Sequence, residues 1–265
     1  MPERGRGRRD LMMLLVVDTA GPTGGVLLGQ ANENSGGARS VDQEMEILGV
    51  MDLHPRFFSA ELIPAIAELL RANERRLADV DAFAVVAGPG SFTGLRVGLS
   101  AVKAMAEATG KPILTLSRLA TMASMAAKLP SSEPADAAVH VVLDAGRGEF
   151  YHGIYRDAGK TCVAESFETL DALTDGIHEQ RGWVVVSETA VKTAFHSVAG
   201  SRLCEVPPPT VRDVLPLAFV ELRAGRFHDP ATVDANYLRR SDAVVVVRTK
   251  AEPMAQVAHS EDAPS

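Results

Sequence analysis

The sequence predicts an α/β protein of two lobes, each built on a mixed β-sheet with flanking helices. The main observation is a repeated pattern, in which an apolar strand ends in an aspartate, a glycine-bearing turn follows, and a second apolar strand returns. The pattern occurs at Asp18 and again at Asp144. Further apolar runs alternate with segments of helical periodicity, which is typical of sheets covered by helices. The length of 265 residues accommodates two such lobes.

The first lobe, residues 11–117, is predicted to begin with strands at 11–17, 26–30 and 44–50. Turn formers between the first two strands predict a hairpin. Two more strands are expected, and they are residues 81–87 and 112–116.

Two helices are predicted within this lobe. Ser59 is a suitable N-cap for the first, and Pro64 falls in its early turns, where proline is tolerated. Its apolar residues at helical spacing are Leu62, Ile63, Ile66, Leu69 and Leu70. The second helix starts near Ser91 or Thr93 and is rich in glycine, alanine and serine. Small side chains of this kind allow close approach of another helix.

The second lobe is expected to span residues 118–247. A helix capped by Ser117 and running to about Ala127 opens it. Residues 130–136 are predicted to form a surface loop and a possible lobe boundary. The remaining elements are strands at 139–143, 150–155 and 183–186 and helices at 188–198 and 211–224.

Composition limits the classes of function. The formal net charge of −7 makes the chain a poor stand-alone binder of nucleic acid. The basic residues 1–10 are expected to be a disordered tail, the alternative being a weak electrostatic arm for RNA. Residues 248–265 are also expected to be disordered. The two cysteines lack disulfide or zinc spacing, and no apolar run is long enough to span a bilayer, so a cytoplasmic protein without membrane contact is expected.

The glycine-rich segment 88–98 joins a predicted strand to the small-residue helix. Such a turn can present free backbone N–H groups to a phosphate, or it can simply let a strand reverse into a closely packed helix. The residues where a nucleotide would be met are Asp18, Thr19, Gly88, Gly90, Ser91 and Thr93. The first hairpin turn lacks a charged phosphate anchor, so these positions are interpreted as a possible vestigial site.

Catalytic and metal chemistry have little support. None of the seven histidines has a second histidine four residues away, and the residue at that spacing from His54 is Phe58. We therefore predict neither a metal site nor catalytic residues. Ser91 is better explained as a helix N-cap than as a nucleophile. Asp18 and Asp144 could coordinate a cation or cap their own turns, and the sequence leaves both readings open.

Two Asp-ended hairpins that face each other across a cleft are the architecture of the actin-like (ASKHA, ribonuclease H-like) fold. Within that fold, four segments resemble the bacterial TsaB (YeaZ) family, which is related to TsaD and to the M22 glycoproteases. The most specific segment is residues 88–98, Gly-Pro-Gly-Ser-Phe-Thr-Gly-Leu-Arg-Val-Gly. Residues 15–20, 144–151 and 237–239 support it.

The resemblance implies a non-catalytic scaffold for threonylcarbamoyladenosine modification of ANN-decoding tRNAs. The implied partners are a TsaD-like catalytic subunit, a TsaE-like ATPase and tRNA through the complex, with a homodimer as an alternative pairing. No cofactor is expected, and ATP or ADP at the partner interface is the alternative. The interface implied by the two helices comprises Leu62, Ile66, Leu69, Gly94, Leu95, Gly98, Leu99 and Val102. The alternative function is that of an actin-fold ATPase or a glycoprotease-like enzyme.

Overall fold

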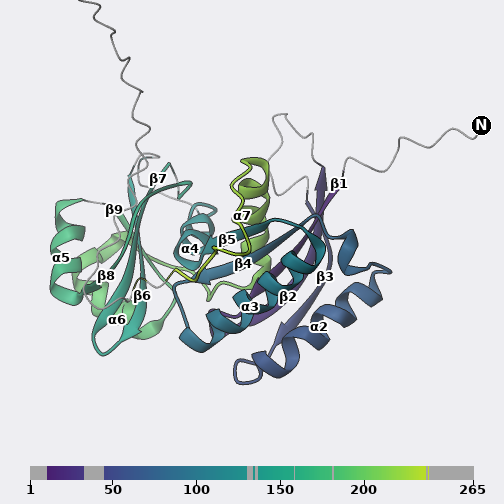
Figure 1. Ribbon diagram of the computed structural model, residues 1–265. Coiled ribbons are helices and arrows are strands. Elements are labelled where there is room, and N and C mark those ends of the chain that lie inside the picture. The colour runs from purple at the N-terminus through teal and green to yellow at the C-terminus, as the bar shows by residue number, and fades with distance from the viewer. Residues whose placement is uncertain are drawn as a thin grey trace, which may run out of the picture.

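The computed structural model of the chain describes residues 11–32, 45–129, 134, 137–157, 159–180, 182–236 and 238. Two five-stranded sheets lie side by side, with helices on their faces (Figure 1). The expected tails, 1–10 and 248–265, lie outside the described residues, as does most of the expected loop 130–136.

The first sheet has the strand order β3-β2-β1-β4-β5. Its strands are β1 (Leu11–Asp18), β2 (Gly24–Asn32), β3 (Met45–Leu53), β4 (Ala82–Gly88) and β5 (Ile113–Ser117). The central strand β1 is antiparallel to β2 and parallel to β4. All five strands and the opening hairpin are therefore confirmed.

The second sheet has the order β10-β9-β6-β7-β8, which is the pattern of the first sheet repeated. Its strands are β6 (Ala138–Gly146), β7 (Glu149–Arg156), β8 (Thr161–Thr169), β9 (Gly182–Val186) and β10 (Leu203–Glu205). In each sheet the central strand pairs antiparallel with the next strand in the chain, which pairs antiparallel with the third, and two parallel strands complete the other side. This duplicated topology is that of the actin-like fold, so the predicted fold class is confirmed.

Six α-helices are described, together with the 3₁₀ turns η1 (Leu77–Asp79) and η2 (Gly200–Arg202). They are α2 (Phe58–Ala72), α3 (Phe92–Thr109), α4 (Arg118–Ala126), α5 (Leu170–Glu179), α6 (Thr189–Ala199) and α7 (Val211–Arg223). The N-caps predicted at Ser91 and Ser117 are confirmed, since each hydroxyl accepts a bond from a backbone N–H of the following turn.

Four elements differ from the sequence prediction. Helix α2 begins at Phe58, and Ser59 lies inside it, because the carbonyl of Phe57 accepts the first N–H groups of the helix. The strands β8 and β10 and the helix α5 were not predicted. Strand β8 lies at a sheet edge, and its polar and half-buried residues lack a clear apolar pattern.

Helix α7 follows the second sheet in the chain but packs on the first. Its buried residues, which include Val214, Leu215 and Phe219, belong to the same core as β1 and β2. Helix α4 packs on the second sheet and also contacts α7, so the two helices lie between the sheets (Figure 1). The sequence prediction assigned residues 118–247, which include α7, to the second lobe. It did not predict that α7 packs on the first sheet.

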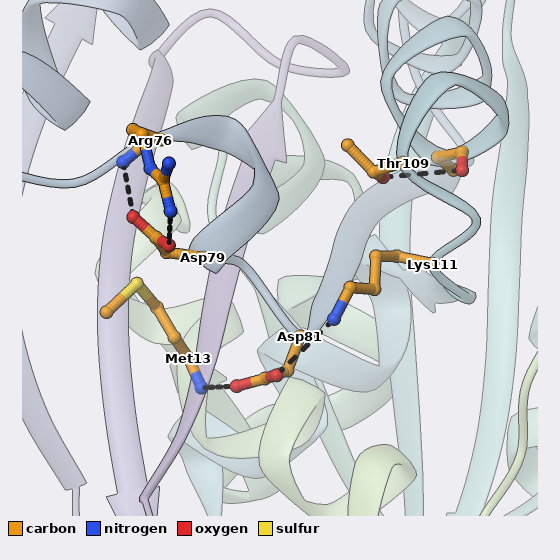
Figure 2. A network of polar contacts seen from close by, with 7 residues as sticks. Met13, Arg76, Asp79, Asp81, Thr109 and Lys111 are labelled. Carbon is orange, nitrogen blue, oxygen red and sulfur yellow. Dashed lines mark hydrogen bonds and ion pairs between the residues drawn. The ribbon is translucent and has the colours of Figure 1, made fainter. Parts of the chain in front are cut away.

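The start of β1 is fixed by a polar network at the edge remote from the hairpin turns (Figure 2). The Asp81 carboxylate accepts a hydrogen bond of 2.8 Å from the backbone N–H of Met13, and the Asp81 N–H donates to the Met13 carbonyl at 2.8 Å. Lys111 lies 3.6 Å from the same carboxylate. Asp81 thus continues the pairing of β1 with β4 by one more residue.

Candidate functional site

A cavity of about 930 Å³ lies between the two lobes. Both hairpin turns, the glycine turn before α3, the first residue of α4 and the segment that follows α7 contribute to its wall. Its polar lining residues are Ser91, Arg96, Arg118, Asp144, Tyr151, Glu188 and Asn236. The repeated hairpins therefore face one cavity, as the fold prediction requires.

The two hairpin aspartates cap their own turns. One carboxylate oxygen of Asp18 accepts a bond of 2.8 Å from the N–H of Ala20, and Asp144 accepts one of 2.8 Å from Gly146. Of the two readings left open by the sequence, turn capping is the one that the geometry supports. Asp144 lines the cavity, whereas Asp18 is 1% exposed and is directed into the protein.

The glycine turn packs against the first hairpin. The N–H of Ser91 donates to the carbonyl of Ala20 at 2.8 Å. A Cβ at Gly90 would lie 2.3 Å from that same carbonyl oxygen, so only glycine fits. Backbone carbonyls, and not an open ring of N–H donors, thus surround this part of the turn. This arrangement favours a turn that reverses the strand into the helix over a turn that binds phosphate.

The glycines of α3 allow the end of β1 to approach the helix. A Cβ at Gly94 would lie 1.9 Å from the carbonyl oxygen of Thr19, and a Cβ at Gly98 would lie 2.4 Å from the Thr19 hydroxyl. Close approach of another helix was the role predicted for these two glycines. In the structure, their close neighbour is a strand end of the same chain.

The six residues predicted at a vestigial nucleotide site do not form one cluster. Gly90 and Ser91 line the cavity. Asp18 and Thr19 are buried beneath it, with the Thr19 hydroxyl bonded to Gly94. Gly88 packs on the segment after α7, where a Cβ would lie 2.6 Å from the Asn236 carbonyl oxygen, and Thr93 is exposed.

Sequence reasoning missed Arg118, the first residue of α4. It is 4% exposed and lines the cavity, and its guanidinium rests on Gly21, where a Cβ would lie 1.4 Å from one of its nitrogens. Burial lowers the pKa of Arg118 and raises the pKa of Asp18, although the two charges attract each other. The sequence could have singled out Arg118 because it follows the predicted N-cap Ser117, and a positive charge is disfavoured at a helix N-terminus.

The two residues at the spacing considered for a metal site, His54 and Phe58, do not fit a metal. The Nδ1 atom of His54 lies 2.9 Å from the Glu61 carboxylate. Four residues later Phe58 is buried against Gly24, and a carbon ring cannot ligate a metal. Within the described residues, no group of three or more histidines, cysteines and carboxylates could hold a metal ion.

The eight residues predicted at a partner interface are buried inside the chain itself. The six apolar side chains among them are at most 6% exposed and belong to the core of the first sheet. The outward faces of α2 and α3 carry other residues. Ile63 is 54% exposed on α2, and Phe92, at the start of α3, is 54% exposed with the Arg96 guanidinium 3.7 Å from its ring centre.

Comparison with known proteins identifies the family. Residues 52–222 match the family model of TsaD, tRNA N6-adenosine threonylcarbamoyltransferase, which is well over half of the chain. The TsaB protein of Escherichia coli K12 is 28% identical over 200 residues, covering 72% of this chain and 85% of that protein. This chain belongs to the TsaD family and, within it, to the TsaB (YeaZ) group. The family resemblance seen in the sequence is confirmed.

Other TsaB relatives are similar over shorter stretches. The TsaB protein of Haemophilus influenzae is 30% identical over 129 residues, which is 48% of this chain and 53% of that protein. Among solved structures, a Pseudomonas aeruginosa protein described as similar to the peptidase YeaZ is 25% identical, with a TM-score of 0.64. The match covers 86% of this chain and all of the other. The TsaB fold therefore extends over most of the chain.

None of the helices in the described part of the chain combines the length and the apolar composition needed to cross a bilayer.

Proposed function

We propose that this TsaB-family chain is a non-catalytic subunit in the threonylcarbamoyladenosine modification of ANN-decoding tRNAs. The observation that carries the proposal is the similarity over 85% of the E. coli relative, whose name is tRNA threonylcarbamoyladenosine biosynthesis protein TsaB. The catalytic subunit would be a TsaD-like protein. A TsaE-like ATPase and the tRNA would join through that pair, and ATP or ADP at the shared interface remains part of the proposal.

The non-catalytic role is supported by the contacts that candidate catalytic and metal-binding positions of the first lobe make within the chain. Phe58, four residues after His54, is a carbon ring that cannot ligate a metal, and the His54 ring is held by Glu61. The Thr19 hydroxyl and one Asp18 oxygen are engaged with backbone groups of the chain itself. These contacts suit a scaffold better than the alternative of an actin-fold ATPase or a glycoprotease-like enzyme.

The proposed pairing surface is the outward face of α2 and α3, which we call the α2–α3 face. The two helices contact each other along the outside of the first sheet (Figure 1). Large apolar groups are exposed at Phe57, Ile63 and Phe92. Small exposed residues on the same helices would let a partner helix approach closely, and they are Ala60, Ala67, Ser100, Ala104 and Ala108.

The residues now proposed to contact the partner are exposed neighbours of the buried residues that the sequence suggested. Leu62, Ile66 and Leu69 alternate around α2 with the exposed Ile63 and Ala67. The buried set would therefore shape the α2–α3 face from beneath, and the partner would touch the exposed set. A second copy of the chain could occupy the same face when a TsaD-like protein is absent.

Reconstitution with TsaD-like and TsaE-like proteins, tRNA and threonylcarbamoyl-AMP tests the proposal. We expect tRNA modification to require this chain and to be lost with Ile63→Glu, together with the complex seen by size-exclusion chromatography. The matched control is Val163→Glu, which changes a 43%-exposed residue on β8 of the other lobe and should leave both intact. Modification that proceeds without the chain would contradict the scaffold role, as would ATP hydrolysis by the isolated chain.

A further inference from the structure

The two lobes have separate apolar cores. The buried residues of the first sheet cluster with α2, α3 and α7, and those of the second sheet form two clusters with α4, α5 and α6. Within the described residues, none of these three clusters joins the two sheets. Because lobes without a shared apolar core are expected to move relative to each other, the angle between them needs a further restraint.

The chain passes between the two cores at three places in the part that the structure describes. The first is Ser117, where β5 ends and α4 begins. The second lies between β10 and α7. The third is Asn236, which stands between Ala235 of the first core and Leu238 of the second. A contact at these crossings acts directly on the angle between the lobes.

Glu165 of β8 binds the side chains at two of the crossings. Its Oε1 atom accepts a hydrogen bond from the Ser117 hydroxyl, and its Oε2 atom accepts one of 3.2 Å from the Asn236 amide. The Tyr155 hydroxyl on the neighbouring strand β7 is a third donor. Glu165 is 9% exposed, and a carboxylate so far from water depends on the donors around it.

Both crossing residues are fixed to the first sheet through their backbones. Ser117 lies opposite Gly88 in the pairing of β5 with β4. The Asn236 N–H donates to the Ala87 carbonyl at 2.8 Å, and its own carbonyl packs so closely on Gly88 that a Cβ there would lie 2.6 Å away. Two side chains from one edge of the first sheet thus reach a single carboxylate of the second sheet.

The Ser117 hydroxyl also connects the carboxylate to α4. Its oxygen caps the helix by accepting from the N–H groups of Leu119 at 3.1 Å and Ala120 at 3.3 Å. A hydroxyl has one proton to donate, and here that proton goes to Glu165. The carboxylate therefore orients the helix cap at the point where the chain enters the second lobe.

We propose that Glu165 is an interlobe latch, which fixes the angle between the two lobes through its bonds to Ser117 and Asn236. Two bonds from one sheet edge to one carboxylate define an orientation, whereas a single bond acts as a pivot. The latch also sets the width of the cavity between the lobes, since Asn236 is part of the cavity wall. It uses no residue of the α2–α3 face, so the proposal does not rest on the pairing function.

Pulsed electron paramagnetic resonance, which measures the distance between two spin labels, tests the proposal. The labels are attached at Asp52→Cys on β3 and Ser197→Cys on α6, two exposed sites, in the full chain with Cys162 and Cys204 replaced by alanine. Dilution with unlabelled chain restricts the signal to distances within one molecule. We expect Glu165→Leu to shift or broaden the distance distribution by more than about 2 Å, the scale of domain rearrangements. An unchanged distribution in this variant would overturn the proposal.

A second variant acts on the latch from the first lobe. Asn236→Leu removes one of the two donors and keeps the backbone bond to Ala87, so the remaining bond should act as a pivot and the distribution should broaden. Because Asn236 is exposed, this variant also decides the question if Glu165→Leu does not fold. A distribution as narrow as that of the unsubstituted chain in Asn236→Leu would contradict the latch.

The matched control is Glu168→Leu, the same change three residues further along β8. The Glu168 carboxylate accepts from the Ser166 hydroxyl and lies 3.8 Å from Nδ1 of His152, both within the second lobe. We expect the distance distribution to stay as in the unsubstituted chain. Equal broadening in Glu168→Leu and Glu165→Leu would show that loss of any carboxylate on β8 loosens the lobes, and it would refute the specific role of Glu165.

Discussion

The hydroxyl of Thr19 donates a hydrogen bond of 2.7 Å to the carbonyl oxygen of Gly94. This bond joins the residue just after β1 to the first turn of α3, two segments that are 75 residues apart in the chain. A side chain at Gly94 would collide with the Thr19 backbone. The glycine segment thus holds the strand end and the helix together, and this internal contact explains its most specific residues.

Gly94→Ala should destabilise the chain. The added Cβ would lie 1.9 Å from the carbonyl oxygen of Thr19, and a backbone atom cannot move aside cheaply. We expect a loss of about 1–3 kcal/mol or more in the free energy of unfolding, the usual range for overpacking a core. Urea denaturation followed by circular dichroism measures it.

Gly176→Ala is the matched control for that variant. Gly176 lies within α5, and a Cβ there would meet no atom within 4 Å. Alanine should stabilise this helix by up to about 1 kcal/mol, because it restricts the unfolded chain more than glycine does. Equal effects of the two substitutions would contradict the account of Gly94.

Acid should destabilise the second lobe through a buried pair of histidines. The carbonyl of Gln180 can only accept, so Nε2 of His140 donates to it at 2.6 Å, and Nδ1 accepts from Nε2 of His152 at 3.1 Å. Burial lowers the pKa of His140 to about 4 from its usual 6.5. The unfolded chain therefore binds more protons between these values, and stability falls as pH falls through that window.

Protonation of His140 in the unfolded chain should lower the free energy of unfolding by about 3 kcal/mol across this pH window. The figure follows from about 1.4 kcal/mol for each unit by which the pKa is lowered. The measurement is the free energy of unfolding at pH 7 and pH 4.5 for the wild type and for His140→Gln. Since the variant lacks the titrating ring, its loss between the two pH values should be smaller. A difference between the two proteins that does not change with pH would contradict this account.

Tyr155→Phe should weaken the junction between the lobes. Glu165 is buried, and its carboxylate accepts bonds from the hydroxyls of Ser117 and Tyr155 and, at 3.2 Å, from the Asn236 amide. Burial raises the pKa of Glu165, so each donor to the charged form matters. Removing the Tyr155 hydroxyl should cost about 1.5–3 kcal/mol, the range for a bond to a charged group.

A double-mutant cycle with Glu165→Gln checks that prediction. The amide is neutral, so Tyr155→Phe should cost less in the Glu165→Gln background than in the wild type. Thermal and urea unfolding of the four proteins give the coupling free energy. If the two substitutions are additive, the hydroxyl does not stabilise the chain through this carboxylate.

Local patterns were enough to predict most of the strands and the duplicated hairpins. Asp18 and Asp144 each follow an apolar run and precede turn formers, and such signals act over a few residues. Strand β8 escaped prediction because it lies at a sheet edge and mixes polar with half-buried residues. The choice of Leu62 and Leu95 as contact residues combined the family resemblance with helical spacing, which shows that a helix has an apolar face without showing what covers it.

The sequence by itself determined the two-lobed actin-like fold and the TsaB family, because turn chemistry, strand pattern and the glycine segment are local features of the chain. Only the tertiary structure decided what each of these features contacts. It placed α7 on the first sheet, Gly94 against Thr19, and Arg118 in the interlobe cavity. The physical reason is that burial and charge environment depend on residues far apart in the sequence, which meet only when the two lobes are assembled.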